Sequence, residues 1–153
     1  MSFAFPKLNL PPAELRLEQK EDEFYVFDII RKKMIFLTPE EWVRQHFLHL
    51  LINHLAYPKS LIKVESALKY NHREKRSDLQ LYDRTGNVFM LIECKSYKIE
   101  MGESTLDQLA TYNKVLDADH VAITNGLRHF CWQKKEDRHT YDPLEDFPSF
   151  PAS

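Results

Sequence analysis

The chain has 153 residues, 43% of them hydrophobic, so it can form one packed domain and is too short for two ordinary ones. No apolar run reaches the roughly 18 residues of a membrane-spanning helix, and the N-terminus lacks the pattern of a secretory signal. The two cysteines, Cys94 and Cys131, are too few for a disulfide framework or a cysteine-based zinc site. These observations predict a cytoplasmic protein with no membrane segment.

The net charge of −2 is distributed unevenly along the chain. Residues 24–135 hold 17 basic and 13 acidic residues, a net charge of +4, whereas the flanks hold 4 basic and 10 acidic residues, a net charge of −6. Most prolines also lie near the two ends. We therefore predict an N-terminal arm at 1–23, a domain at 24–135, and an acidic, proline-bearing tail at 136–153. The positive domain is compatible with nucleic-acid binding.

The first half of the predicted domain contains two short strands and a helix. The strands are expected at 24–28 and 33–37, around a basic link. Thr38 is expected to cap the helix, and Glu41 three residues later completes a capping box. Apolar residues then recur at helical spacing until Pro58 ends the helix.

Five further strands and a second helix are expected after this point. Residues 61–70 are expected to form a strand followed by irregular chain, and 77–84 and 88–95 two more strands, the last apolar enough for a central strand covered on both faces. Ser104 is expected to cap the second helix, and strands at 120–124 and 128–133 are joined by an Asn125-Gly126 turn. The order α-β-β-β-α-β-β predicts an α/β fold with a central mixed sheet flanked by helices.

The hairpin in the middle of the domain brings acidic residues together. Side chains of a strand alternate, so Glu93 and Lys95 share a face and Cys94 points away. A hairpin that turns at residues 85–86 without a bulge pairs Asp78 with Glu93. Adjacent carboxylates repel unless a divalent cation lies between them, and Lys95 could orient or deprotonate a water or stabilise a phosphorane-like transition state. Metal-dependent phosphodiester hydrolysis requires this arrangement.

These residues resemble a known nuclease pattern. Ser77-Asp78, a gap of 14 residues and Glu93-Cys94-Lys95 are similar to the PD-(D/E)XK nuclease superfamily, with serine in place of the proline. Gln108 and Tyr112 resemble the Gln-x-x-x-Tyr motif of its RecB-like branch. Together with LTPEEWVRQ at 37–45 and ITNG at 123–126, the pattern resembles the type I restriction enzyme R-protein N-terminal family over about residues 26–132.

The resemblance implies a restriction-endonuclease-like fold and a Mg²⁺- or Mn²⁺-dependent nuclease acting on DNA. Asp78 and Glu93 would bind the metal with the carbonyl of Cys94, and Lys95 would be the catalytic lysine. Glu41 on the first helix is the candidate for a further ligand.

The same resemblance implies supporting residues and partners. Gln108 would lie near the metal centre, and Tyr112, one turn on, would support it. Relatives of this fold often act as dimers, so a homodimer or a larger restriction or repair complex is expected. The helicase motor of restriction R proteins is missing, since no phosphate-binding Gly-x-x-x-x-Gly-Lys-Ser/Thr loop is present in the chain.

The basic run at 69–76 directly precedes Asp78. It is either a solvated loop or a loop that contacts the DNA backbone. The candidates for nucleic-acid binding are Lys69, Arg73, Lys75, Arg76 and Tyr112. Three histidines on the first helix, His46, His49 and His54, do not have the spacing of a zinc site.

Structural alternatives stay open beside each functional interpretation. Asp78 could pair with Arg76 at the surface, and Glu93 could form a salt bridge with Lys95 or Lys98. Glu41 could serve only as a capping residue, and Gln108 and Tyr112 could lie on an exposed helix face. In that case Asp78 and Glu93 would have a purely structural role. A separate alternative, favoured by the small size and the missing motor, is a non-catalytic nucleic-acid-binding or complex-forming module that keeps the nuclease fold.

Overall fold

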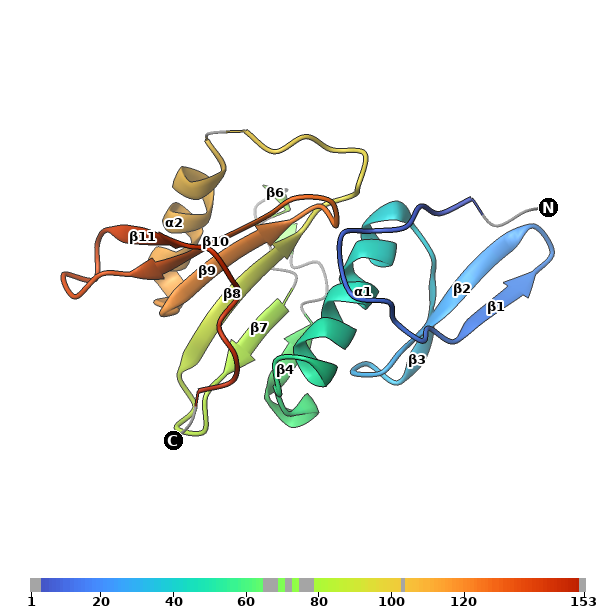
Figure 1. The fold of residues 1–153 in the computed structure, drawn as a ribbon, viewed down its shortest axis with the longest axis horizontal. Coiled ribbons are helices and arrows are strands. Elements are labelled where there is room, and N and C mark those ends of the chain that lie inside the picture. The colour runs from blue at the N-terminus through green and yellow to red at the C-terminus, as the bar shows by residue number, and fades with distance from the viewer. Residues whose placement is uncertain (1–3, 65–68, 71–72, 75–78, 103, 152–153) are drawn as a thin grey trace.

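The structure is a computed structural model, and it describes residues 4–64, 69–70, 73–74, 79–102 and 104–151 (Figure 1). Its central unit comprises, in chain order, α1 (Pro39–Asn53), β4 (Ile62–Val64), β7 (Leu79–Tyr82), β8 (Val88–Cys94), α2 (Thr105–Leu116), β9 (His120–Thr124), β10 (His129–Lys134) and β11 (Tyr141–Leu144). The strands form one six-stranded sheet in the order β11-β10-β9-β8-β7-β4, with β8 and β9 parallel and the other pairs antiparallel. The predicted α-β-β-β-α-β-β order and the mixed sheet are confirmed.

Smaller elements precede and interrupt this unit. Strands β1 (Leu17–Lys20), β2 (Glu23–Asp28) and β3 (Lys33–Phe36) form a separate antiparallel sheet before α1. A single 3₁₀ turn, η1 (Lys59–Leu61), leads into β4, and β5 (Lys69–Tyr70) pairs with β6 (Arg73–Glu74). Because β1 belongs to the expected N-terminal arm and β11 to the expected tail, both flanks contribute strands to the fold.

The two helices pack on opposite faces of the sheet. Helix α1 buries Val43 and Phe47 in a cluster that includes Met90 and Ile92 of β8. Helix α2 buries Leu109 in a second cluster with Leu91 of β8 and residues of β9. The even-numbered residues at the end of β8 therefore face α1, and the odd-numbered residues face α2, as strand alternation requires.

The N-terminal ends of the helices differ in their capping. At α1, the Thr38 hydroxyl accepts a hydrogen bond from the Glu41 backbone N–H at 3.0 Å, which confirms the predicted N-cap. The capping box is not completed, because the Glu41 carboxylate binds Arg31, Arg44 and Gln45 instead. At α2, Ser104 occupies the predicted N-cap position, but the expected side-chain cap is absent: Ser104 has helical backbone angles and its side chain makes no capping bond. A cap residue needs an extended backbone to direct its oxygen at the free N–H groups.

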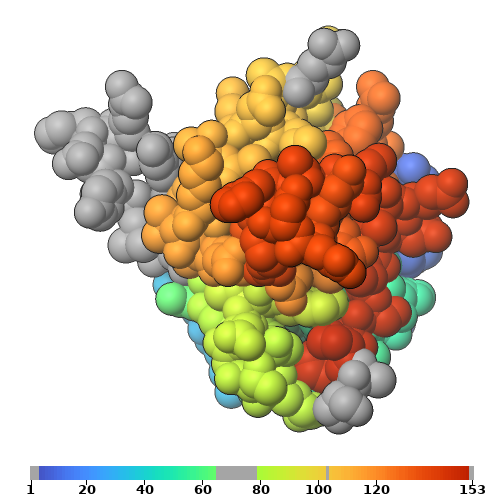
Figure 2. All heavy atoms as spheres, turned by 90° about the vertical axis from the view of Figure 1, so that its left-hand side faces the viewer, coloured from blue at the N-terminus to red at the C-terminus, as the bar shows by residue number. Residues whose placement is uncertain are grey.

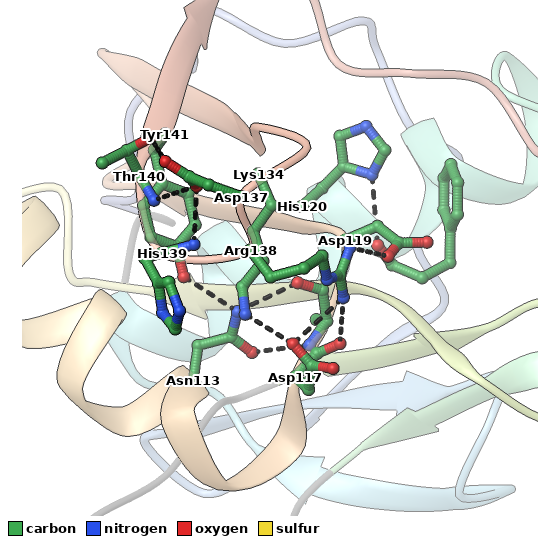
Figure 3. Close-up of polar contacts among 12 residues, drawn as sticks. Asn113, Asp117, Asp119, His120, Lys134, Asp137, Arg138, His139, Thr140 and Tyr141 are labelled. Carbon is green, nitrogen blue, oxygen red and sulfur yellow. Dashed lines mark hydrogen bonds and ion pairs between the residues drawn. The ribbon is translucent and has the colours of Figure 1, made fainter.

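The C-terminal end of α2 is tied to the loop between β10 and β11 (Figure 3). Asp117 ends the helix in the left-handed conformation and binds Lys134 at 2.5 Å and Arg138 at 3.0 Å. Arg138 also binds Asp119 at 2.8 Å, and the Asn113 amide donates to the Tyr141 hydroxyl at 3.0 Å. These contacts fasten the outer strands of the sheet to the helix.

Residues 6–9 pack between α1 and the β9–β10 turn. Leu8 is buried, the Trp42 indole donates to the Pro6 carbonyl at 2.8 Å, and the Asn9 N–H donates to the Gly126 carbonyl at 2.8 Å. The predicted Asn125-Gly126 turn is confirmed, since Gly126 has a φ of 85° and the strands on either side pair. The turn therefore anchors the N-terminal segment as well as the hairpin.

Candidate functional site

Glu93 and Lys95 lie at the carboxyl end of β8. The Lys95 ammonium nitrogen is 3.5 Å from a Glu93 carboxylate oxygen, and the two side chains are 37% and 23% exposed, respectively. Cys94 between them is fully buried in the α1-side cluster. The predicted alternation is confirmed, and the carboxylate and ammonium share one partly exposed edge of the sheet.

The sheet holds this pair in position through its backbone. The Lys95 N–H donates to the Thr124 carbonyl at 2.8 Å, which extends the β8–β9 ladder by one residue beyond β8. Since β8 and β9 are parallel, their carboxyl ends meet at the same edge. The ion pair itself contributes little stability, about 1 kcal/mol at most, because both groups reach solvent. The pair matters for chemistry, because it places a carboxylate and an ammonium group side by side.

The hairpin register next to this pair agrees with the prediction, but the predicted absence of a bulge is wrong. Leu79 pairs with Ile92 and Leu81 pairs with Met90, which is the register expected for a pairing of Asp78 with Glu93. Nearer the turn the register differs by one residue, with Tyr82 opposite Val88, and a bulge restores it. Asp78 lies outside the described residues, so its pairing with Glu93 stays a prediction.

Turn chemistry explains the missed bulge. The Asp83 carboxylate accepts hydrogen bonds from the backbone N–H groups of Thr85 and Asn87 at 2.9 and 3.0 Å. These bonds fix a five-residue turn in place of the assumed tighter one. The longer turn shifts the pairing by one residue, and the bulge between Leu81 and Tyr82 shifts it back. The register beyond the bulge is therefore the one expected for a tight turn without a bulge.

Helix α2 contributes Gln108 and Tyr112 on the sheet face that also carries Glu93. Gln108 is exposed, as the structural alternative expected. Tyr112 is half-buried and packs against the α2-side cluster around Leu91 and Val121. Tyr112 therefore belongs partly to the core. The sequence had predicted a position outside the apolar stripe of the helix.

Glu41 lies in a buried ion-pair network at the start of α1. One of its oxygens is 2.9 Å from both the Arg31 and the Arg44 guanidinium, and the other accepts from the Gln45 amide at 3.2 Å. Both oxygens are thus engaged by protein donors, and the metal role of Glu41 stays a prediction. The described part of the chain holds no group of three or more His, Cys, Asp or Glu side chains that could bind a metal.

The donors that are described fit a hard cation only in part. The Glu93 carboxylate and the Cys94 backbone carbonyl offer oxygen atoms, which Mg²⁺ and Mn²⁺ prefer. A further carboxylate is needed, and the predicted one, Asp78, is outside the described residues.

The predicted nucleic-acid-binding run is described only in its backbone, and in part. Lys69 belongs to β5 and Arg73 to β6. Lys75 and Arg76 lie outside the described residues, so their role stays a prediction. The network around Glu41 was not predicted from the sequence, because Asp28 at the end of β2 and Arg31 in the following turn reach α1 only in the folded protein.

Comparisons with known proteins identify the family. Residues 39–148 match the family described as the type I restriction enzyme R protein N terminus (HSDR_N), and no curated protein matches the chain. The match runs from the start of α1 past β11, later at both ends than the expected 26–132. Neither described helix has the length and apolar character needed to cross a membrane. Because more than half of the chain is matched, it belongs to the type I restriction enzyme R protein N-terminal family.

Proposed function

We propose that this chain is a metal-dependent nuclease domain that hydrolyses phosphodiester bonds of DNA. The observation that carries the proposal is the Glu93–Lys95 pair, which lies at an accessible sheet edge with a nitrogen–oxygen distance of 3.5 Å. Membership of a restriction enzyme family supports the substrate class. The hairpin register at Leu79–Leu81 further supports a partner carboxylate from Asp78, one residue beyond it.

The residues have distinct roles in this proposal. Glu93, Asp78 and the Cys94 carbonyl would hold Mg²⁺ or Mn²⁺, which supplies an activated water and stabilises negative charge on the phosphate. Lys95 would place its ammonium against a phosphate oxygen, where a positive charge favours the more negative transition state. Gln108, exposed on the same face, would orient the attacking water or the phosphate by hydrogen bonding.

Cleavage assays with matched variants test the proposal. Plasmid and oligonucleotide DNA are incubated with wild type, Asp78→Ala, Glu93→Gln and Lys95→Ala in Mg²⁺ or Mn²⁺. Each variant is expected to lose activity by about 100-fold or more, the scale of removing one charge-stabilising group. Lys98→Ala is the control, because Lys98 is an exposed lysine three residues further along. Undiminished cleavage by all three site variants would show that the site is elsewhere.

A non-catalytic binding module is the second candidate. It is favoured by Glu41, whose carboxylate is already occupied by two arginines and so is poorly suited to a metal. In this case DNA binding would occur without cleavage in any metal, and it would be unaffected by Mg²⁺. For either candidate we propose action within a homodimer or a larger restriction or repair complex, to be checked by the mass of the purified protein in solution.

A further inference from the structure

The sheet face that carries Glu93 also carries an aromatic row on β10, two strands away, with the buried Ile123 of β9 between them. The register pairs Glu93 with Ile123 of β9 and Ile123 with Phe130 of β10. Directly opposite residues point to the same face, so the Phe130 ring shares the face of Glu93. Neighbouring strands are about 4.8 Å apart, which places Phe130 roughly 10 Å across the sheet from Glu93.

Trp132 lies one step further along the same face. Its ring and that of Phe130 are stacked, with centroids 6.0 Å apart and planes 17° from parallel. Both rings are half-buried: they pack against the α2-side cluster and keep part of their surface exposed. In Figure 2 the orange-red surface of the β10–β11 hairpin lies beside the lighter orange surface of α2.

A cation completes the row at the end nearest the candidate site. The Arg128 guanidinium lies 5.4 Å from the centre of the Phe130 ring, and Arg128 is exposed. No carboxylate pairs with it among the residues that the structure describes. At the other end of β10 the positive charges of Lys134 and Arg138 are balanced by Asp117 and Asp119 (Figure 3).

The charged end of the row, Arg128, lies at the same end of the sheet as the candidate site. The Asn125 N–H donates to the Arg128 carbonyl at 3.2 Å, and Asn125 follows Thr124, which pairs with Cys94. Arg128 is therefore on the same sheet edge as Lys95. An unbalanced cation, then two partly exposed rings, suits a ligand that alternates phosphates and flat bases.

We propose that Arg128, Phe130 and Trp132 bind single-stranded nucleic acid, the unpaired nucleotides that flank the phosphodiester at the Glu93–Lys95 site. This inference rests on the proposed nuclease function for the position of the cut. Bases stack on aromatic rings without regard to sequence, and a guanidinium over a ring can pair with the adjoining phosphate. Duplex DNA keeps its bases stacked internally and gains nothing from the rings.

Binding of a fluorescein-labelled thymidine 15-mer and of a duplex of equal length, measured by anisotropy in EDTA at low salt, tests the proposal. Phe130→Leu with Trp132→Leu should weaken single-strand binding by about tenfold or more, the scale of losing stacked bases. Duplex binding should change less than twofold. Trp132→Phe, which keeps a ring, should retain single-strand affinity, and Arg128→Gln should weaken binding and reduce the salt dependence by about one charge.

The control is Phe36→Leu, an aromatic that is 50% exposed on the separate N-terminal sheet. Unchanged single-strand affinity in the double variant, equal losses for both DNA forms, or no wild-type binding would overturn the proposal. Because EDTA prevents metal-dependent cleavage, the outcome is independent of the nuclease assay. If single-strand binding depends on Phe130 and Trp132 as expected but no DNA is cleaved in Mg²⁺ or Mn²⁺, the result would count against the proposed nuclease function alone.

Discussion

A buried carboxylate, Asp28, joins the end of β2 to the start of α1. It has no exposed surface and accepts hydrogen bonds from the Ile30 and Arg31 backbone N–H groups, the Arg31 side chain and the Gln45 amide at 2.7 to 2.8 Å. Burial alone would raise the pKa of Asp28, but these hydrogen bonds and the Arg31 charge outweigh it and lower the pKa. Asp28 is therefore ionised in the folded protein.

Asp28→Asn should destabilise the protein by about 1.5 to 3 kcal/mol, because the hydrogen bonds that Asp28 accepts lose its charge and Arg31 keeps only Glu41, which it shares with Arg44, as a counter-charge. A lowered carboxyl pKa contributes stability above the unfolded value near 4, and that contribution disappears as pH falls through the folded value. The variant should lose this part of the acid dependence. Urea unfolding at pH 7 and pH 3 measures both effects, with Asp22→Asn in an exposed turn as the control. A loss no larger than that of the control would contradict the role assigned to Asp28.

For single residues, the sequence predicted the direction of a side chain correctly where only the alternation along one strand determines it. The shared face of Glu93 and Lys95 follows from the period of two of any strand, and the buried Cys94 follows with it. The partners of Glu41 could not be predicted in the same way. Arg31 is ten residues away, in the turn between β2 and β3, and capping chemistry already explained an acidic residue at the position of Glu41.

At the scale of elements, the N-caps of the two helices offer a matched comparison. Thr38→Ala removes a 3.0 Å hydrogen bond to the Glu41 N–H and should cost about 1 kcal/mol of unfolding free energy. Ser104→Ala should cost much less, because the Ser104 side chain makes no capping bond. Equilibrium urea unfolding of both variants measures the difference. Equal costs would mean that the Thr38 bond does not stabilise α1.

The elements that the sequence missed are edge strands. The segment Tyr141–Leu144 contains Asp142 and Pro143, which favour loops, yet it pairs with β10 as β11. Proline is tolerated there because an edge strand has N–H positions that need no partner. Central strands such as β8 were predictable because burial on both faces selects a continuous apolar run, whereas an edge strand carries no such signature.

The turn after β9 provides a second comparison between elements. Gly126 has a φ of 85°, and an added Cβ would lie 2.9 Å from a Leu8 methyl and 3.0 Å from a Val43 methyl. Gly126→Ala should therefore add steric displacement of the N-terminal segment to the backbone strain of about 1 kcal/mol. Gly86→Ala, with a φ of 90° and open space around it, carries the strain alone. Faster proteolysis near the N-terminus in Gly126→Ala than in Gly86→Ala is the expected result, and equal rates would contradict it.

For the whole molecule, the negatively charged flanks are not structurally separate from the positively charged residues 24–135. The expected arm at 1–23 contributes Leu8 to the main core and β1 to a sheet, and the expected tail contributes Phe147 beside the same core. Truncation of either flank would thus remove packing as well as acidic charge. Leu8 and Phe147 pack on the α1 side of the sheet, whereas Arg138 and Tyr141 of the expected tail lie against α2.

Four buried or half-buried histidines should make the stability of the whole molecule depend on pH in a range above that in which the carboxylates titrate. Burial lowers the pKa of His46, His49, His120 and His129. The unfolded chain, where histidine titrates near 6.5, then binds protons that the folded protein does not. Stability should fall as the pH decreases from 7.5 to 5.5, seen as a lower urea midpoint. His120→Gln should reduce this slope and His139→Gln, in an exposed loop, should not. Equal slopes in all three proteins would show that proton uptake by His120 on unfolding does not contribute.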